Sequence, residues 1–293
     1  MSTSTMRRRL LKGLPLAGWL WGDAARAQAQ ARSRAHVAHV AHPAKAVRWP
    51  ADPLASPSWP DLARQFTDGG PIVFSTRVLV QAPVHADDPL NVPVRIDAKA
   101  LLGTAGMGGQ RVRRIRVVAD LNPVRHVLDF EPLQALPVLA LRMRLEQASP
   151  VRALVQTDDG QWHVGGTQVG AAGGGCTAPG GARSDGSWQD TLGQVQARWF
   201  DNAQEGSRRL RLRVMHPMDT GLVPGVPAFY LETLTLTDAR GQAACRLFLH
   251  EPVAENPLFT LEWPLATDTG QPGPWRVQGR DNNGLRIDQV LQS

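Results

Sequence analysis

The sequence contains few cysteines and none of the common catalytic motifs. Only Cys176 and Cys245 occur among 293 residues, and no Cys-x-x-Cys pair is formed. The chain also lacks a Gly-x-Ser-x-Gly nucleophile turn, a phosphate-binding loop and a dinucleotide fingerprint after a strand. A thiol enzyme would further need an imidazole beside its cysteine, which the sequence gives no means of placing. These absences predict a protein that is not an enzyme and that has no metal or cofactor of its own.

The charge balance and the apolar runs argue against two further classes. The formal net charge is +6, but residues 1–27 hold five basic side chains and one acidic one, so they supply +4 of it and leave +2 for residues 28–293. A chain this close to neutral gives no electrostatic case for binding nucleic acid. After the N-terminal segment, no run approaches the ~20 apolar residues that a membrane-spanning helix requires. We therefore expect neither a nucleic-acid partner nor a membrane span.

The N-terminus has the pattern of a cleaved export signal over residues 1–27. A basic stretch precedes the apolar segment from Gly13 to Trp21, and the small residues Ala25 and Ala27 suit a signal peptidase. The basic stretch, Arg-Arg-Arg-Leu-Leu-Lys, resembles a twin-arginine signal. Its preceding residue is Met where serine or threonine is common, which leaves the general secretory route open. Either route predicts a protein of the periplasm.

Residues 28–57 are predicted to form a disordered extension, because alanine, arginine, proline and histidine dominate them. His36, His39 and His42 lie three residues apart within it. The short Ala-His-Val repeat and the nearby prolines argue against a helix that would bring their rings together. No metal site is predicted there.

The ordered part is predicted to begin at residue 58 and to be almost entirely β-structure. Ser58 can cap a short helix from Trp59 to about Phe66, and beyond it the hydrophobic period becomes two. Strands are predicted over residues 76–81, 92–97, 113–119, 138–146, 152–157, 161–164, 194–199, 210–214, 230–237, 244–250, 258–263 and 286–290. They fall into two sets, which predicts two β-sandwich domains, 58–169 and 191–293, joined by an arm and linker over 170–190.

The arm is predicted to carry Cys176 as an accessible thiol. Nine of the 22 residues 165–186 are glycine, so no helix or strand is expected to persist there. Gly173, Gly174 and Gly175 directly precede the cysteine. We therefore expect a thiol presented on a mobile arm, which suits a covalent carrier better than a catalyst.

Two interpretations of the cysteine pair are open. An exported protein with two cysteines would ordinarily form one disulfide, here Cys176 to Cys245. Alternatively, Cys245 shares a strand face with Leu247 and Leu249 and is a small core residue, which leaves Cys176 free. The free thiol is favoured, because a bridge would tie down the arm.

The first half of the ordered chain contains several short motifs in a recognisable order: Ala82-Pro83, Ala86-Asp87-Asp88, Val92-Pro93-Val94, Ala119-Asp120-Leu121-Asn122-Pro123 and Gly174-Gly175-Cys176. With these motifs, the stretch from about Trp59 to Cys176 resembles the sulfur carrier SoxY of the thiosulfate-oxidising system, whose chain ends in Gly-Gly-Cys-Gly-Gly and bears a sulfur intermediate on that cysteine. One departure is that Thr177-Ala178-Pro179 follows the cysteine, so this arm is held at both ends.

The second half contains His216-Pro217-Met218-Asp219-Thr220-Gly221, followed by Asn256-Pro257-Leu258-Phe259, Trp275, Asp281 and Gly284. With these residues, the stretch from about Gln194 to the C-terminus resembles SoxZ, the partner of SoxY, whose family motif is His-Pro-Met-Glu-Thr-Gly. Both families have immunoglobulin-like sandwiches. A fusion of the two is similar to the quinoprotein dehydrogenase-associated SoxYZ-like carriers, which are encoded beside pyrroloquinoline-quinone alcohol dehydrogenases.

The resemblance implies a periplasmic covalent carrier that holds a sulfur-containing or other thiol-linked intermediate on Cys176. Its partners would be periplasmic oxidoreductases, either Sox-type enzymes or a quinoprotein alcohol dehydrogenase. The loop of His216, Pro217, Met218 and Asp219 is a candidate for docking a partner or shaping the exit of the arm, and a loop-stabilising role accounts for it equally well. The alternative function is a binding or assembly module for a quinoprotein dehydrogenase, in which the arm is only a linker.

Overall fold

The computed structural model describes residues 49–103, 110–181, 186, 188–265 and 274–291. Residues 49–293 belong to one compact unit. The export signal predicted over 1–27 lies outside the described residues, and so do His36, His39 and His42. Within the compact unit the structure consists of two β-sheets and a few short helices.

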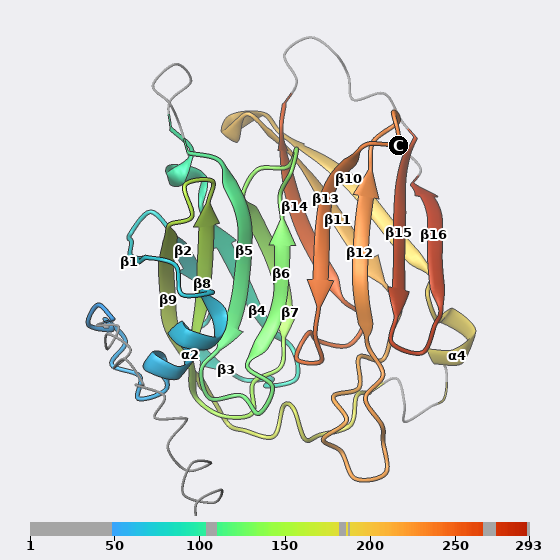
Figure 1. The fold of residues 1–293 in the computed structure, drawn as a ribbon. Coiled ribbons are helices and arrows are strands. Elements are labelled where there is room, and N and C mark those ends of the chain that lie inside the picture. The colour runs from blue at the N-terminus through green and yellow to red at the C-terminus, as the bar shows by residue number, and fades with distance from the viewer. Residues whose placement is uncertain (1–48, 104–109, 182–185, 187, 266–273, 292–293) are drawn as a thin grey trace, which may run out of the picture. The chain divides into compact units, whose positions relative to one another are not determined.

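The first sheet contains ten of the described strands and is the sheet nearer the viewer in Figure 1. Its order is β1 (Ile72–Phe74), β9 (Trp162–Ala171), β8 (Ser149–Thr157), β5 (Val112–Ala119), β6 (His126–Glu131), β13 (Ala243–Leu249), β12 (Leu231–Thr237), β15 (Trp275–Asp281) and β16 (Arg286–Leu291), with β3 (His85–Ala86) also paired to β9. The two pairings of β9 with β1 and β3 are parallel, and the other pairings in this sheet are antiparallel.

The second sheet lies behind the first in Figure 1 and contains six described strands. Its order is β10 (Val195–Asn202), β11 (Ser207–Val214), β14 (Leu258–Pro264), β7 (Val138–Met143), β4 (Val92–Asp97) and β2 (Leu79–Gln81). Alternation explains how these strands pack: Leu210 and Leu212 of β11 are buried in the core, whereas Arg211 between them is exposed. The inner faces of both sheets contribute to one continuous hydrophobic core.

Both sheets run without a break through the two halves of the chain. In the first sheet β6 pairs with β13, with Phe130 opposite Leu247. In the second sheet β7 pairs with β14, with Leu139 opposite Leu261. The sequence predicted two sandwiches joined through the cysteine arm, whereas in the structure the halves also share both sheets and the core. The physical reason is that each half ends in open strand edges, which bind the edges of the other half.

The helix predicted from Trp59 to about Phe66 is α2 (Trp59–Phe66), but the side chain of Ser58 forms no capping hydrogen bond at its start. The buried face of α2 packs on the first sheet against Trp162 and neighbouring apolar side chains. The other short elements are η1 (Lys99–Leu101), α4 (Trp188–Thr191) and η2 (Ala203–Glu205). None of the helices in the described ranges has the length and apolar character to cross a membrane.

Residues 49–57 fall within the stretch that the sequence assigns to a disordered extension. In the structure Asp52 accepts two hydrogen bonds, of 2.7 and 2.8 Å, from the guanidinium of Arg152. Arg152 is buried and also pairs with buried Asp120. The ordered chain therefore begins before Ser58, because a buried guanidinium needs the second carboxylate that this segment supplies.

Candidate functional site

The glycine-rich region contains regular structure, which corrects the sequence prediction. Strand β9 continues to Ala171 and includes Gly165, Gly166 and Gly170. A Cβ at Gly165 would collide with the carbonyl oxygen of Val78. Gly165 thus allows the backbones of β9 and of residue 78 to approach closely, and the sequence alone does not distinguish this role from chain flexibility.

The three glycines before the cysteine form a tight turn and not a free arm. Gly173 and Gly174 have φ values of +105° and +80°, which residues with a side chain rarely adopt. Gly175 donates a 3.1 Å hydrogen bond to the carbonyl oxygen of Leu145. A Cβ at Gly175 would collide with the carbonyl oxygens of Pro89 and Leu145. The turn is therefore seated against the backbone of the segment that follows β7.

Hydrogen bonds to the main chain hold Cys176 on both sides. Its amide donates to the Glu146 carboxylate at 3.0 Å, and its carbonyl accepts a 2.6 Å hydrogen bond from the Thr220 hydroxyl. The same carboxylate accepts from the amide and the hydroxyl of Thr177. Cys176 is only 1% exposed. The prediction of a presented thiol on a mobile arm is therefore wrong for this conformation.

The surroundings of the thiol suppress its reactivity. Burial raises the pKa of Cys176 to about 12, the nearby Glu146 carboxylate raises it further, and the Arg144 guanidinium acts in the opposite direction. With this pKa only about one thiol in 10⁵ would be ionised at pH 7. The closed conformation thus protects the sulfur from reaction.

Cys176 nevertheless lies close to the surface. The next residue, Thr177, is exposed, and so is Pro179. Its retaining contacts are polar and local, whereas Cys245 is fully buried in β13 beside Leu247. Both cysteines are free, so the disulfide alternative does not occur in the structure, and the core position predicted for Cys245 is confirmed.

Arg144 joins the turn to the rest of the molecule. Its guanidinium donates to the carbonyl oxygens of Gly175 and Ala178 at 3.3 and 3.4 Å. Asn122 fixes the backbone of residues 144–146, because its side chain donates to the Arg144 carbonyl at 2.8 Å and accepts from the Glu146 amide at 2.9 Å. Arg144, which is 1% exposed, is thereby fixed between the core and the turn.

Sequence reasoning missed the roles of Arg144 and Glu146. Their alternation with Leu145 predicted two outward charges on a strand that continues to residue 146. Strand β7 ends at Met143 instead, so both side chains are free to turn toward the glycines some 30 residues later in the chain. The one sequence signal for this region was the Ala119-Asp120-Leu121-Asn122-Pro123 motif of the SoxY resemblance, because Asn122 bonds the backbone of Arg144 and Glu146.

The predicted docking loop is inside the protein. His216, Pro217, Met218 and Asp219 are all buried. His216 Nδ1 accepts a 3.1 Å hydrogen bond from the Met218 amide, and Asp219 forms a two-way backbone bridge with Phe229. These four side chains offer a partner no surface, and the loop-stabilising alternative accounts for their positions.

The same motif does reach the candidate site through its next residue. Thr220 is the residue that bonds the Cys176 carbonyl, so the loop of the second half restrains the cysteine of the first. In the part of the chain that the structure describes, no group of three histidine, cysteine or acidic side chains is arranged to hold a metal ion.

These features define a β-sheet protein whose surface turn of glycines holds a single protected cysteine. Residues 63–176 match the model of the family described as sulfur oxidation protein SoxY. The match ends at Cys176. A solved structure, the sulfur carrier protein SoxY from Chlorobium limicola f thiosulfatophilum, is similar with 24% identity and a TM-score of 0.32, covering 39% of this chain and 96% of that one. The comparison with curated proteins found no match.

Proposed function

We propose that this protein is a periplasmic, non-enzymatic carrier that holds a sulfur-containing or other thiol-linked intermediate on Cys176. The observation that carries the proposal is that the SoxY family match extends to Cys176 and ends there. The export signal predicted over residues 1–27 accounts for the location. In this proposal, residues 191–293 act as a SoxZ-like half that braces the SoxY-like half, residues 58–169, and the strands of each half form an immunoglobulin-like arrangement.

The buried thiol is the resting state of this carrier. Release of the turn would return the pKa of Cys176 from about 12 toward its ordinary value of 9.0. The thiolate fraction at neutral pH would then rise about 10³-fold. If the intermediate is a sulfur anion, joining it to the thiolate through a sulfur–sulfur bond removes two electrons, which a partner oxidoreductase accepts. Sox-type enzymes and a quinoprotein alcohol dehydrogenase are the proposed partners.

Intact-mass analysis of the protein from its native periplasm tests this function. We expect an adduct that disappears on reduction and that peptide mapping places on Cys176. The variant Cys176→Ser should carry no adduct, whereas Cys245→Ser should keep it, because Cys245 lies in the core. A native protein without any reducible adduct during growth on the relevant substrate would refute the carrier function.

The burial of Cys176 favours one rival function, a binding or assembly module for a quinoprotein dehydrogenase. For such a module the cysteine turn is only a structural connection between the halves. Cys176→Ser separates the two functions: a carrier loses its physiological activity, while an assembly module retains it. Thermal unfolding of the variant shows whether a loss of activity comes from a loss of folded protein.

A further inference from the structure

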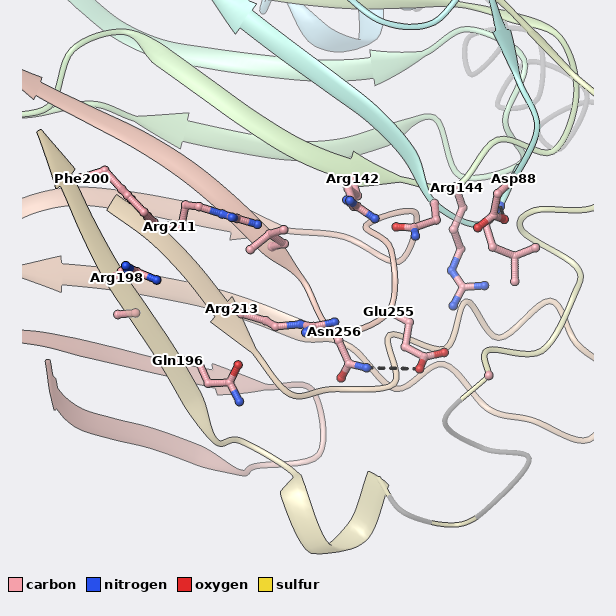
Figure 2. Close-up of a pocket in the computed structure, with 15 residues that line it drawn as sticks. Asp88, Arg142, Arg144, Gln196, Arg198, Phe200, Arg211, Arg213, Glu255 and Asn256 are labelled. Carbon is pink, nitrogen blue, oxygen red and sulfur yellow. Dashed lines mark hydrogen bonds between the residues drawn. The ribbon is translucent and has the colours of Figure 1, made fainter. Parts of the chain in front are cut away.

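A cavity of about 650 Å³ opens on the outer face of the second sheet, beside the segment that follows Cys176. Its walls come from both halves of the chain: β10, β11 and the start of β14 on one side, and the end of β7 with residues 88–91 on the other. Figure 2 shows side chains from these elements directed into the same space. Its volume lies in the range of small-molecule sites.

Positive charge dominates the lining of the cavity. Two carboxylates, Asp88 and Glu255, line it. Against them stand five arginines: Arg142, Arg144, Arg198, Arg211 and Arg213. With every group ionised, the lining carries an excess of three positive charges. Such a concentration differs from the near-neutral charge of the chain beyond residue 27.

The sheet register brings like charges face to face in this cavity. Arg198 of β10 lies directly opposite Arg211 of β11, and Arg213 follows on the same face of β11. Like charges in directly opposed positions destabilise a sheet. An anion between them would remove that repulsion.

The neighbouring arginine on β11 shows how the same sheet neutralises a charge elsewhere. Arg209 bonds the buried Glu262 carboxylate at 2.9 Å and the Glu205 carboxylate at 3.2 Å. The cavity arginines 142, 198, 211 and 213 form no ion pair with any described residue. On β11, Arg209 is therefore neutralised by carboxylates, whereas Arg211 and Arg213 are not. This contrast indicates that the positive charge in the cavity can be neutralised by a bound anion.

Arg144 is the buried cation of the site: it is 1% exposed and lines the cavity. Its guanidinium bonds only carbonyl oxygens, those of Gly175 and Ala178, and forms no ion pair within the described ranges. Burial opposes the charged form of Arg144, while the Glu255, Asp219 and Asp88 carboxylates favour that form without forming a described ion pair with it. An anion in the cavity would add a further counter-charge.

We infer that this arginine cavity binds a tetrahedral oxyanion group, and that the group is a sulfur oxyanion. Guanidinium groups bind such oxygens through paired, charge-assisted hydrogen bonds. The choice of sulfur rests on the proposed function; the choice of an oxyanion rests on the arginines alone. The group arrives either as the free ion or as the charged end of an intermediate attached to Cys176.

Calorimetric titration of the full-length protein with sodium thiosulfate and sodium sulfate in low-salt buffer tests the site. We expect saturable binding with one site per chain, and a loss of at least about tenfold in affinity for the double variant Arg211→Gln/Arg213→Gln. The matched control is Arg113→Gln/Arg286→Gln, which removes the same charge from two exposed strand arginines outside the cavity. Absence of saturable binding, or an equal loss in the control, overturns the inference.

A second pair of titrations distinguishes the two sources of the ligand. Reduced Cys176→Ser protein should bind thiosulfate as the wild type does, since Cys176 does not line the cavity. Protein isolated with an anionic adduct on Cys176 should bind added thiosulfate more weakly if the adduct fills the cavity, and normally if the free ion is the ligand. A failure to find any adduct would refute the carrier function while leaving the anion site testable on the reduced protein.

Discussion

Two side chains from different halves of the chain hold the main chain of Cys176. Glu146 binds the amide side of the cysteine and Thr220 binds its carbonyl side. The Glu146 carboxylate also accepts from Thr177, and Arg144 donates to two carbonyl oxygens of the turn, so the closed turn is retained by a local set of polar interactions. Removing one of them costs roughly 1 kcal/mol, so a single substitution shifts the balance between the closed turn and a locally open one.

Replacing Thr220 with valine should release the turn. The substitution removes the donor and leaves the Cys176 carbonyl without its partner, at a cost of about 1–2 kcal/mol to the closed state. The open population, and with it the rate of iodoacetamide modification of Cys176, should rise about 5- to 30-fold. Peptide mass mapping measures that rate separately from Cys245. Thr235→Val in β12 is the control, and equal rates in the two variants would show that Thr220 does not retain the turn.

At the scale of elements, the seam between β6 and β13 contains a cluster of charged and titratable groups. Asp129 of β6 accepts hydrogen bonds from Arg116 at 2.8 and 2.9 Å and lies 2.9 Å from His126. The His126 ring stacks on His250 with their centroids 4.0 Å apart. Burial is the largest cause that lowers the pKa of His250, to about 4, and His126 lowers it further. The seam thus favours a neutral His250.

Acid should therefore loosen this seam. His250 takes up a proton near pH 6.5 in the unfolded chain but only near pH 4 in the folded one, so the unfolded state binds more protons between these values and stability falls as the pH drops through them. The paired Asp129, whose pKa is lowered from 3.8, loses its contribution only below that window. Urea unfolding between pH 7 and 4 measures the slope. His250→Gln should show a shallower slope than the wild type, and parallel slopes would contradict this assignment.

Strands β11 and β6 show what sequence reasoning can and cannot predict. Strand β11 was predictable because one face is buried and the other carries arginines. Strand β6 was not, since its four central residues are all buried and Asp129 is hidden by its pairing with Arg116. Strand β15 was also missed, because Gly279 interrupts its apolar face. Period-two hydrophobic alternation appears only in strands that are buried on one face, so a strand covered on both faces is not detected by it.

At the scale of the whole unit, the contacts that create the site join distant parts of the sequence. The family resemblance identified Cys176, but no local pattern reveals that Thr220 lies 2.6 Å from its carbonyl. Nor does the arginine pattern of β11 reveal that Arg142 and Arg144 complete the same cavity from β7 and its continuation. Hydrophobic alternation predicted the strands, whereas the register between halves depends on strand pairings across more than 100 residues.

The β6–β13 and β7–β14 pairings have a consequence for chains cut in two. Fragments 49–181 and 188–293, expressed together, should assemble into a stable complex, because each fragment completes both ladders of the other. Expressed alone, each should aggregate through its uncovered strands. Size-exclusion chromatography with light scattering distinguishes these outcomes. Two soluble, monomeric fragments that do not bind each other would contradict the expectation. The covalent connection then acts chiefly as a tether that keeps the effective concentration of one fragment near the other high, even in a dilute compartment.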